Sequence, residues 1–352
     1  MGNLRQLVLI ALVLLGCRGA LAADLSPVPE PRVALEPVRV APESGRFTLI
    51  EENDALAPSP TDRWYTQGFQ LSYLSAPVAG PTLDWLFPTT FTNPSSPRTR
   101  KWEFVFGQSI FTPENTKLIP PDPLDRPYAG WLYAGLGWYQ QTNRNTLDHL
   151  ELLLGVVGPD ALAKQVQGGF HDLLGQKTSA AWAFQLKNEP GIMLSYDHKW
   201  RIGMPVGGSF SIDAIPEFGG SVGNVFTYGQ LGMMVRFGQN LNADYGPARI
   251  RPALSGTTWF DRSQLDGPFG WYIFAGVQGR AIARNIFLDG NSFVTSASVS
   301  KRPLVGDVSA GASFFWLDFA KLDLVLTWRS DEFVGQSQPS RFGGVNLSFR
   351  LP

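Results

Sequence analysis

Charge, cysteine and long apolar runs are all scarce in this 352-residue sequence. Only 17% of the residues are charged, against roughly 25% in an average soluble domain, and the formal net charge is −1. This balance excludes a nucleic-acid-binding protein that relies on a basic surface. The single cysteine, Cys17, excludes a disulfide framework and a cysteine-based zinc site. No run of about 18–20 apolar residues follows Leu25, so the sequence predicts no transmembrane helix in the mature chain.

Glycine and aromatic residues are abundant instead. The chain has 37 Gly, 24 Phe and 11 Trp, and 44% of its residues are hydrophobic, which excludes a chain that is disordered throughout. Low charge without a membrane-spanning helix is typical of a transmembrane β-barrel, in which only alternate residues face lipid.

The N-terminus has the three parts of a secretory signal peptide. Arg5 supplies the positive charge, residues 7–15 supply the apolar stretch, and Ala20-Leu21-Ala22 forms a cleavage motif. We therefore predict a signal peptide over residues 1–22. An alternative is that Leu14-Leu15-Gly16-Cys17 is a lipoprotein box in which Cys17 is lipidated. Either form of processing exports the chain.

The residues after the signal peptide divide into a leader and one domain. Residues 23–45 are rich in proline and have no apolar periodicity, so we expect an extended leader. Residues 46–352 show neither an internal repeat nor a second domain, and we predict that they form a single barrel domain.

Apolar and polar residues alternate along most of this domain. Between Gly191 and Ile202, every second residue from Ile192 onward is apolar or His198, and the residues between them are mostly polar. Such a period of two places apolar side chains on one face of a strand. In a membrane barrel that face meets lipid and the polar face lines the lumen.

About twelve segments follow this pattern, an even number that fits an antiparallel bacterial barrel. They cover residues 46–54, 65–76, 101–111, 128–141, 146–157, 191–203, 208–221, 226–237, 270–285, 303–317, 321–332 and 341–351. The sequence thus predicts an all-β fold, a twelve-stranded antiparallel transmembrane β-barrel. Periodicity alone does not tell inside from outside, so a soluble β-sandwich or lipocalin-like barrel stays the alternative.

One segment follows a helical period. Leu162, Val166, Phe170 and Leu173 recur at helical spacing, with Asp160 as the expected N-cap and Gly175 as the expected stop. Gln167 and His171 are four residues apart and share a helical face. That face either looks towards the barrel wall or is exposed to solvent on a helix that covers the barrel mouth.

The chain has only three histidines. The alternation places His149 towards the lumen and His198 on the apolar face, as an interfacial residue. His171 is the one histidine expected outside a strand, and it is the best candidate for acid–base chemistry.

Carboxylates gather where strands begin and end. Glu51-Glu52-Asn53-Asp54 ends the first predicted strand, Asp62 precedes the second, and Asp122 and Asp125 precede the fourth. Oxygen ligands of this kind suit a hard cation, Ca²⁺ above all, although polar rims of a barrel have the same composition.

An ordered set of motifs resembles the lipid A 3′-O-deacylase family of the LpxR type. The set consists of Glu52-Asn53-Asp54, Thr61-Asp62-Arg63-Trp64-Tyr65-Thr66-Gln67-Gly68, Asp125-Arg126-Pro127-Tyr128-Ala129-Gly130-Trp131, Gly158-Pro159-Asp160 with Gln167 and His171, and Trp182 with Gln185-Leu186-Lys187-Asn188-Glu189-Pro190. The resemblance extends from about Phe47 to the C-terminus.

The resemblance implies a bacterial outer-membrane enzyme with Ca²⁺ as cofactor. Its substrate would be lipid A of lipopolysaccharide in the outer leaflet, from which it removes the 3′-linked acyl chains. Carried over position by position, the implied catalytic residues are Asn53, Asp54, Thr66, Gln167 and His171. Asp54 would also bind the metal, and Lys117 is the loosely aligned candidate for substrate binding. We expect a monomer.

One position departs from the family pattern. The family has a Glu six residues after the helix His, and this chain has Lys177 there. Glu189 is a candidate to replace the missing carboxylate. Lys177 leaves open a second function, a non-catalytic structural or binding barrel of the same fold. A small pore is a third possibility, but a pore does not need the Asn-Asp, Thr and His set.

Overall fold

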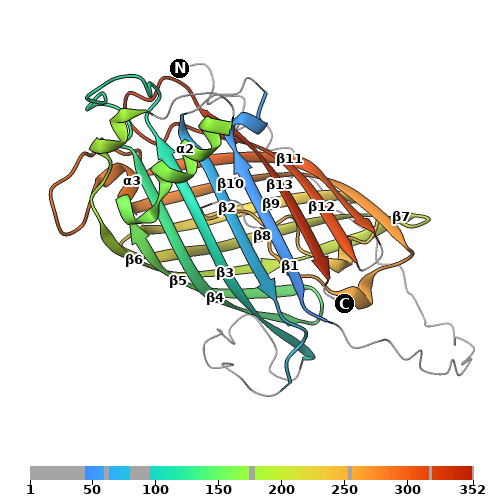
Figure 1. Ribbon diagram of the computed structural model, residues 1–352. Helices are drawn as coiled ribbons and strands as arrows, with labels where there is room; N and C mark the ends of the chain where they lie inside the picture. The colour runs from blue at the N-terminus through green and yellow to red at the C-terminus, as the bar shows by residue number, and fades with distance from the viewer. Residues whose placement is uncertain are drawn as a thin grey trace, which may run out of the picture. The chain divides into compact units, whose positions relative to one another are not determined.

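A closed antiparallel barrel forms most of the protein (Figure 1). The computed structural model describes residues 44–58, 63–79, 96–173, 179–252, 256–316 and 319–350. The strands are β1 (Arg46–Asn53), β2 (Trp64–Leu74), β3 (Arg98–Thr112), β4 (Ala129–Thr142), β5 (Thr146–Val157), β6 (Glu189–Trp200), β7 (Ile202–Gly207), β8 (Phe210–Gly223), β9 (Phe226–Gly238), β10 (Phe269–Asn285), β11 (Leu304–Trp316), β12 (Ala320–Arg329) and β13 (Ser340–Arg350). The predicted signal peptide, nearly all of the leader, Cys17, Gly175 and Lys177 lie outside these residues.

The pairing of β1 closes the sheet. Thr48 lies opposite Ser72 of β2 and opposite Ser348 of β13, so the first strand joins the last. β6 and β7 flank Arg201 and pair with β8 in one continuous register, and together they form a single strand of the wall. The thirteen assigned strands therefore make a barrel of twelve, which confirms the sequence prediction of a twelve-stranded all-β fold.

The apolar face of the alternation points outward. Ile192 and Leu194 of β6 are exposed, whereas Met193, Ser195 and Asp197, at the alternate positions of the strand, are buried. The wall thus presents apolar side chains outside and polar ones inside, which is the reverse of a soluble barrel. Among the described residues, no helix has the length and apolar character needed to cross a membrane.

The connection between β9 and β10 reaches into the barrel, and we call its described residues, 239–252 and 256–268, the lumen segment. Its Arg249 pairs with Glu52 of β1, and its Arg251 pairs with Glu151 of β5 at 2.9 Å. The carbonyl oxygen of its Pro252 accepts hydrogen bonds from Arg280 and Arg329 on the far wall. These contacts with strands all round the barrel were not predicted from the sequence.

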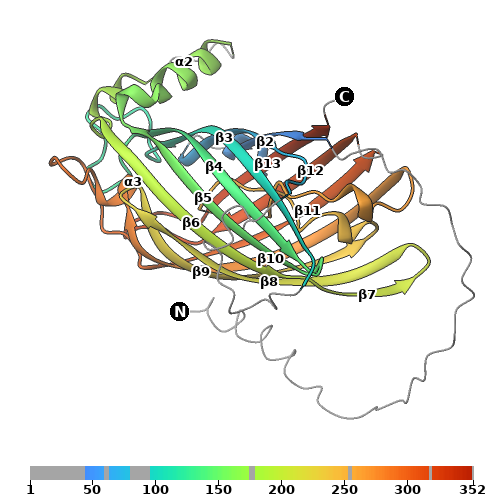
Figure 2. The same cartoon turned by 90° about the horizontal axis from the view of Figure 1, so that it is seen from below.

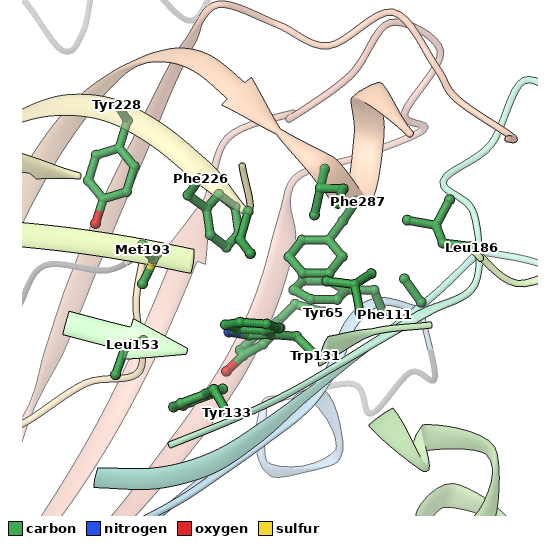
Figure 3. Packing of buried hydrophobic residues seen from close by; sticks show 14 of the residues in the cluster. Tyr65, Phe111, Trp131, Tyr133, Leu153, Leu186, Met193, Phe226, Tyr228 and Phe287 are labelled. Atoms are coloured by element: carbon green, nitrogen blue, oxygen red, sulfur yellow. The ribbon is translucent and has the colours of Figure 1, made fainter. Parts of the chain in front are cut away.

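Aromatic side chains fill the lumen at the end of the barrel where β1 ends and β2 begins (Figure 3). Phe287 of α3 (Ile286–Asp289) stacks on Phe111 of β3 with ring centroids 4.1 Å apart, and Trp131 stacks on Tyr133. The cavity between the lumen segment and the wall has a volume of about 30 Å³, which is room for about one water molecule. A filled interior of this kind argues against the small pore.

Two of the three histidines lie in strands, as the alternation predicts. His149 is buried inside the barrel and stacks on Tyr139, with ring centroids 4.0 Å apart. His198 lies on the outward face, where Trp200 contacts its ring and Asp148 lies 2.6 Å from its Nδ1 atom.

A helix, α2, lies against the outside of the wall near one end of the barrel, which we call the α2 end (Figure 2). α2 (Ala163–Leu173) follows the short 3-10 helix η5 (Pro159–Ala161) and packs against β3 and β4. The prediction of Asp160 as N-cap was wrong. Asp160 lies within η5, which starts at Pro159 and ends at the left-handed Leu162, so α2 begins only at Ala163.

Gly130 allows α2 to approach the wall. A Cβ atom at this position would lie 2.5 Å from the Cβ of Ala163 and 3.1 Å from that of Ala161. Leu162 and Val166 of the predicted apolar stripe are exposed, whereas Gln167 is buried. The apolar edge of α2 therefore faces away from the wall, and the face with Gln167 is turned to it.

We predict that Gly130→Leu displaces α2 while the barrel stays folded, because overpacking at such a contact costs about 1–3 kcal/mol. Limited proteolysis of the connection 158–188 should become faster, while the heat-modifiable gel mobility of the barrel is unchanged. Ala134→Leu is the matched control, four residues further along the same face of β4. Equal proteolysis of Gly130→Leu and wild type would contradict this account of α2 docking.

Candidate functional site

The end of β1 positions Asn53 and Asp54 differently. The Oδ1 atom of Asn53 accepts a hydrogen bond from the N–H of Ala55 at 2.8 Å and so caps the 3-10 helix η2 (Asp54–Leu56). This turn buries the Asp54 side chain, whose Oδ2 atom accepts a hydrogen bond from the N–H of Arg63 at 2.8 Å. The guanidinium of Arg63 pairs with Glu114 at 2.6 Å, which ties the loops after β1 and β3 together.

Thr66 lies at an irregularity of β2. The pairing of β2 with β3 shifts register between Tyr65 and Gln67, and this re-aims the side chain between them. The hydroxyl of Thr66 lies 2.7 Å from the hydroxyl of Thr112 at the end of β3, and both residues are buried. The bulge thus brings two hydroxyl groups together at the α2 end.

Gln167 joins α2 to the next segment. Its Oε1 atom accepts a hydrogen bond from the indole N–H of Trp182 at 2.7 Å. Trp182 belongs to the 3-10 helix η6 (Ala180–Phe184), is fully buried, and packs against Tyr128 with ring centroids 4.8 Å apart. Trp182 therefore fixes the face of α2 that is turned to the wall.

The remaining predicted residues lie around this centre. The backbone of His171 lies in α2, about one helical turn after Gln167. Lys117 is exposed in the loop between β3 and β4, where its N–H donates to Oδ1 of Asn115 at 3.1 Å. The carboxylate of Glu189 accepts hydrogen bonds from Asn224, Asn291 and the backbone of Ser292, and so binds the loop after α3.

Polar residues at outward positions of three strands form what we call the outer polar patch. On β3, the outward residues Trp102, Phe104 and Phe106 are exposed, but Gln108 and Thr112 further along the same face are polar and buried. The patch consists of Glu51, Asn53, Gln67, Gln108 and Thr112. A polar interruption of an apolar face signals that something covers it, and this signal is readable in the sequence.

Hydrogen bonds connect the patch to itself and to the cover. Gln67 donates to Oε1 of Glu51 at 3.0 Å, and Gln108 donates to the carbonyl oxygen of Ala161 at 2.6 Å. Glu52 does not belong to the patch, because the alternation turns it into the lumen, where it meets Arg249 and the hydroxyl of Tyr65. The carboxylate run at the end of β1 is thus divided between the two sides of the wall.

A buried ion pair joins two loops at the α2 end. Arg126 lies 3.1 Å from Glu332, which joins the loop before β4 to the loop before β13. Burial opposes ionisation of Glu332, but the charges of Arg126 and Arg329 outweigh it and hold the pKa of Glu332 below its ordinary value.

These residues offer carboxylate, amide and hydroxyl oxygens beside a lipid-facing wall. Such a group is suited to bind a hard cation and to hold a polar headgroup whose apolar tails stay in the membrane. The structure brings Asn53, Asp54 and Thr66 to the same end of neighbouring strands, with Gln167 on the helix that covers the adjacent wall. It leaves Lys117 on an exposed loop.

Comparison with known proteins agrees with this architecture. The family model described as outer membrane protein LpxR matches residues 8–351. Among solved structures, LpxR from Salmonella typhimurium superposes with a TM-score of 0.70 at 21% identity, covering 87% of this chain and 100% of that one. The β domain of the Bordetella autotransporter BrkA gives a TM-score of 0.43 at 9% identity, covering 88% and 99%. No curated protein matches the chain.

The structural likeness at this identity shows a shared fold, whereas the family model extends over nearly the whole sequence. The barrel is therefore an outer membrane barrel, and the chain belongs to the LpxR family of outer membrane proteins.

Proposed function

We propose that this protein is a Ca²⁺-dependent esterase that removes the 3′-linked acyl chains of lipid A. The observation that carries the proposal is the outer polar patch, which places Asn53, beside Asp54, and Thr112, beside Thr66, on the lipid side of the wall. Outer-membrane barrels have their longer loops outside the cell. Most of the long connections lie at the α2 end, so the site would meet the outer leaflet, where lipid A resides.

The donor set at the end of β1 fits Ca²⁺. This ion prefers six to eight oxygen ligands, including carboxylates, amide carbonyls and waters. Asp54 would hold the ion with its carboxylate, and Asn53 and the paired hydroxyls of Thr66 and Thr112 are nearby oxygens. When bound, Ca²⁺ supplies positive charge that polarises the ester carbonyl and stabilises the developing oxyanion.

His171 would act as the general base. It takes a proton from water, whose oxygen attacks the ester carbonyl carbon, and it returns the proton to the sugar oxygen as the carbon–oxygen bond breaks. The products are a fatty acid and a free 3′-hydroxyl group. Gln167 would keep α2 in place through Trp182. In an alternative arrangement, Asp54 orients His171 instead of binding the metal.

Lys177 favours a second candidate function, a non-catalytic binding barrel of the same fold. The family pattern has a carboxylate at this position, and a lysine there would remove an oxygen ligand of the kind that a hard cation prefers. The two functions differ in whether lipid A loses acyl chains.

We predict that His171→Ala abolishes deacylation, because loss of a general base typically lowers the rate by about 10²–10⁴-fold. Mass spectrometry of lipid A from cells that express each variant measures the loss of acyl mass. Gln165→Ala, at an exposed position of the same helix, is the matched control and should retain activity. Unmodified lipid A in cells with the wild-type protein would refute the esterase and favour the binding barrel.

Asp54→Asn should raise the Ca²⁺ concentration for half-maximal activity by at least about tenfold, because Ca²⁺ affinity depends on ligand charge. Purified protein in detergent is depleted with a chelator and titrated with Ca²⁺ or Mg²⁺ against lipid A. Asp160→Asn removes an exposed carboxylate outside the site and serves as control. Full activity of the chelated wild type would exclude the metal role without excluding hydrolysis.

Lys177→Glu should increase deacylation, because it restores the carboxylate of the family pattern. The same charge change at exposed Lys164 of α2 controls for a general electrostatic effect. Activity is measured as the initial rate of fatty-acid release at saturating Ca²⁺. A lower rate for Lys177→Glu than for wild type would mean that the lysine itself contributes to the site.

A further inference from the structure

A groove runs along the outer face of β8–β11. Figure 2 shows β8 and β9 on the side of the barrel away from α2. Its volume is about 840 Å³, and it lies in the half of the wall nearer the α2 end. Small residues form its floor, namely Gly229 of β9, Gly279 and Ala281 of β10, and Gly306 of β11. Neighbouring outward positions of these strands carry Leu, Ile, Val and Phe.

Packing within the chain does not explain the glycines of the floor. An added Cβ at Gly229 or Gly279 would meet no atom within 4 Å, and neither glycine has the left-handed backbone conformation that excludes other residues. Gly130 differs, because Ala163 of the same chain occupies the space above it. Glycine within a strand weakens the strand and often marks the close approach of a ligand. The space above Gly229 and Gly279 is therefore open to a molecule outside the chain.

The walls of the groove are apolar and project into the lipid region. Leu231 is 70% exposed and Leu304 is 71% exposed, and Phe218 of β8 lines the other side. A groove with a floor of glycine and alanine and apolar walls fits a hydrocarbon chain.

Cationic residues lie at the end of the groove nearer the α2 end. The guanidinium of Arg284 donates to the carbonyl oxygens of Gly290 and Asn224 and to the hydroxyl of Ser292. These partners are all neutral, so within the described residues no ion pair balances the charge of Arg284. Arg302, two residues before Leu304, is half exposed and lies 4.0 Å from Asp331. An anionic headgroup above a hydrocarbon chain matches this arrangement.

We propose that this groove binds an acyl chain of lipopolysaccharide, with a phosphate of the headgroup at Arg284. The α2 end carries most of the long connections and so faces the outer leaflet, whose lipid is lipopolysaccharide. The proposal depends on the outer-membrane location of the barrel and not on the esterase activity. The groove is a second lipid site, separated from the outer polar patch by the width of the barrel.

The test uses a photo-crosslinking residue, p-benzoylphenylalanine, in place of Leu231 in the full-length protein expressed in cells. Leu324 of β12 is the matched position, because it is also outward and lies five residues from the α2 end of its strand. We expect lipopolysaccharide adducts, detected by antibody, to be about tenfold more abundant at position 231, as for a difference of about 1.4 kcal/mol in binding.

Filling the groove should remove this difference. Gly279→Leu is combined with the probe at 231, and Ala275→Leu, on the same face of β10 but outside the groove, is the control. Arg284→Gln should also lower the adduct yield, and heat-modifiable gel mobility verifies that each barrel is folded. Equal yields at 231 and 324, or a yield that Gly279→Leu leaves unchanged, would overturn the proposal. Adducts to phospholipid or to a second copy of the chain in place of lipopolysaccharide would overturn it too.

Discussion

The structure depends on one constraint: in lipid, every backbone N–H and C=O group needs a partner within the protein. The antiparallel pairing of Thr48 with Ser72 and with Ser348 satisfies this requirement, because it leaves no edge strand in the wall. Closure then fixes which side chains face lipid and which face the lumen. The outer polar patch is unusual for this reason, because Gln108 and Thr112 are polar and occupy outward positions of the wall.

The strands of the wall could be predicted from the sequence because the alternation that produces them depends only on neighbouring residues. Alternation of two residue types needs no knowledge of distant partners, so each predicted segment matches a strand of the structure. The lumen segment has no such period. Its Arg249 and Arg251 resemble any polar loop until the carboxylates of Glu52 and Glu151, about two hundred and one hundred residues away, are placed opposite them. Long-range ion pairs of this kind leave no signature in one sequence.

The residues of the candidate site could also be predicted in part. They came from an ordered set of motifs that resembles the family, and the structure places Asn53, Asp54 and Thr66 at one end of adjacent strands, with Gln167 on the helix α2. Two local features differ from what the sequence alone indicates. Glu52 of the run Glu51–Asp54 points inward, and Asp160, the predicted helix cap, lies in a separate 3-10 turn that starts at Pro159.

The lumen segment has a consequence for how the barrel is assembled. Arg249 contacts β1 through Glu52, and the carbonyl oxygen of Ala248 accepts a hydrogen bond from Asn346 of β13. The segment is thus attached to both strands of the pair that closes the barrel. The lumen segment therefore bridges the first and last strands from inside the barrel. Its contacts with Glu52 and with Asn346 can exist together only when β1 and β13 lie side by side.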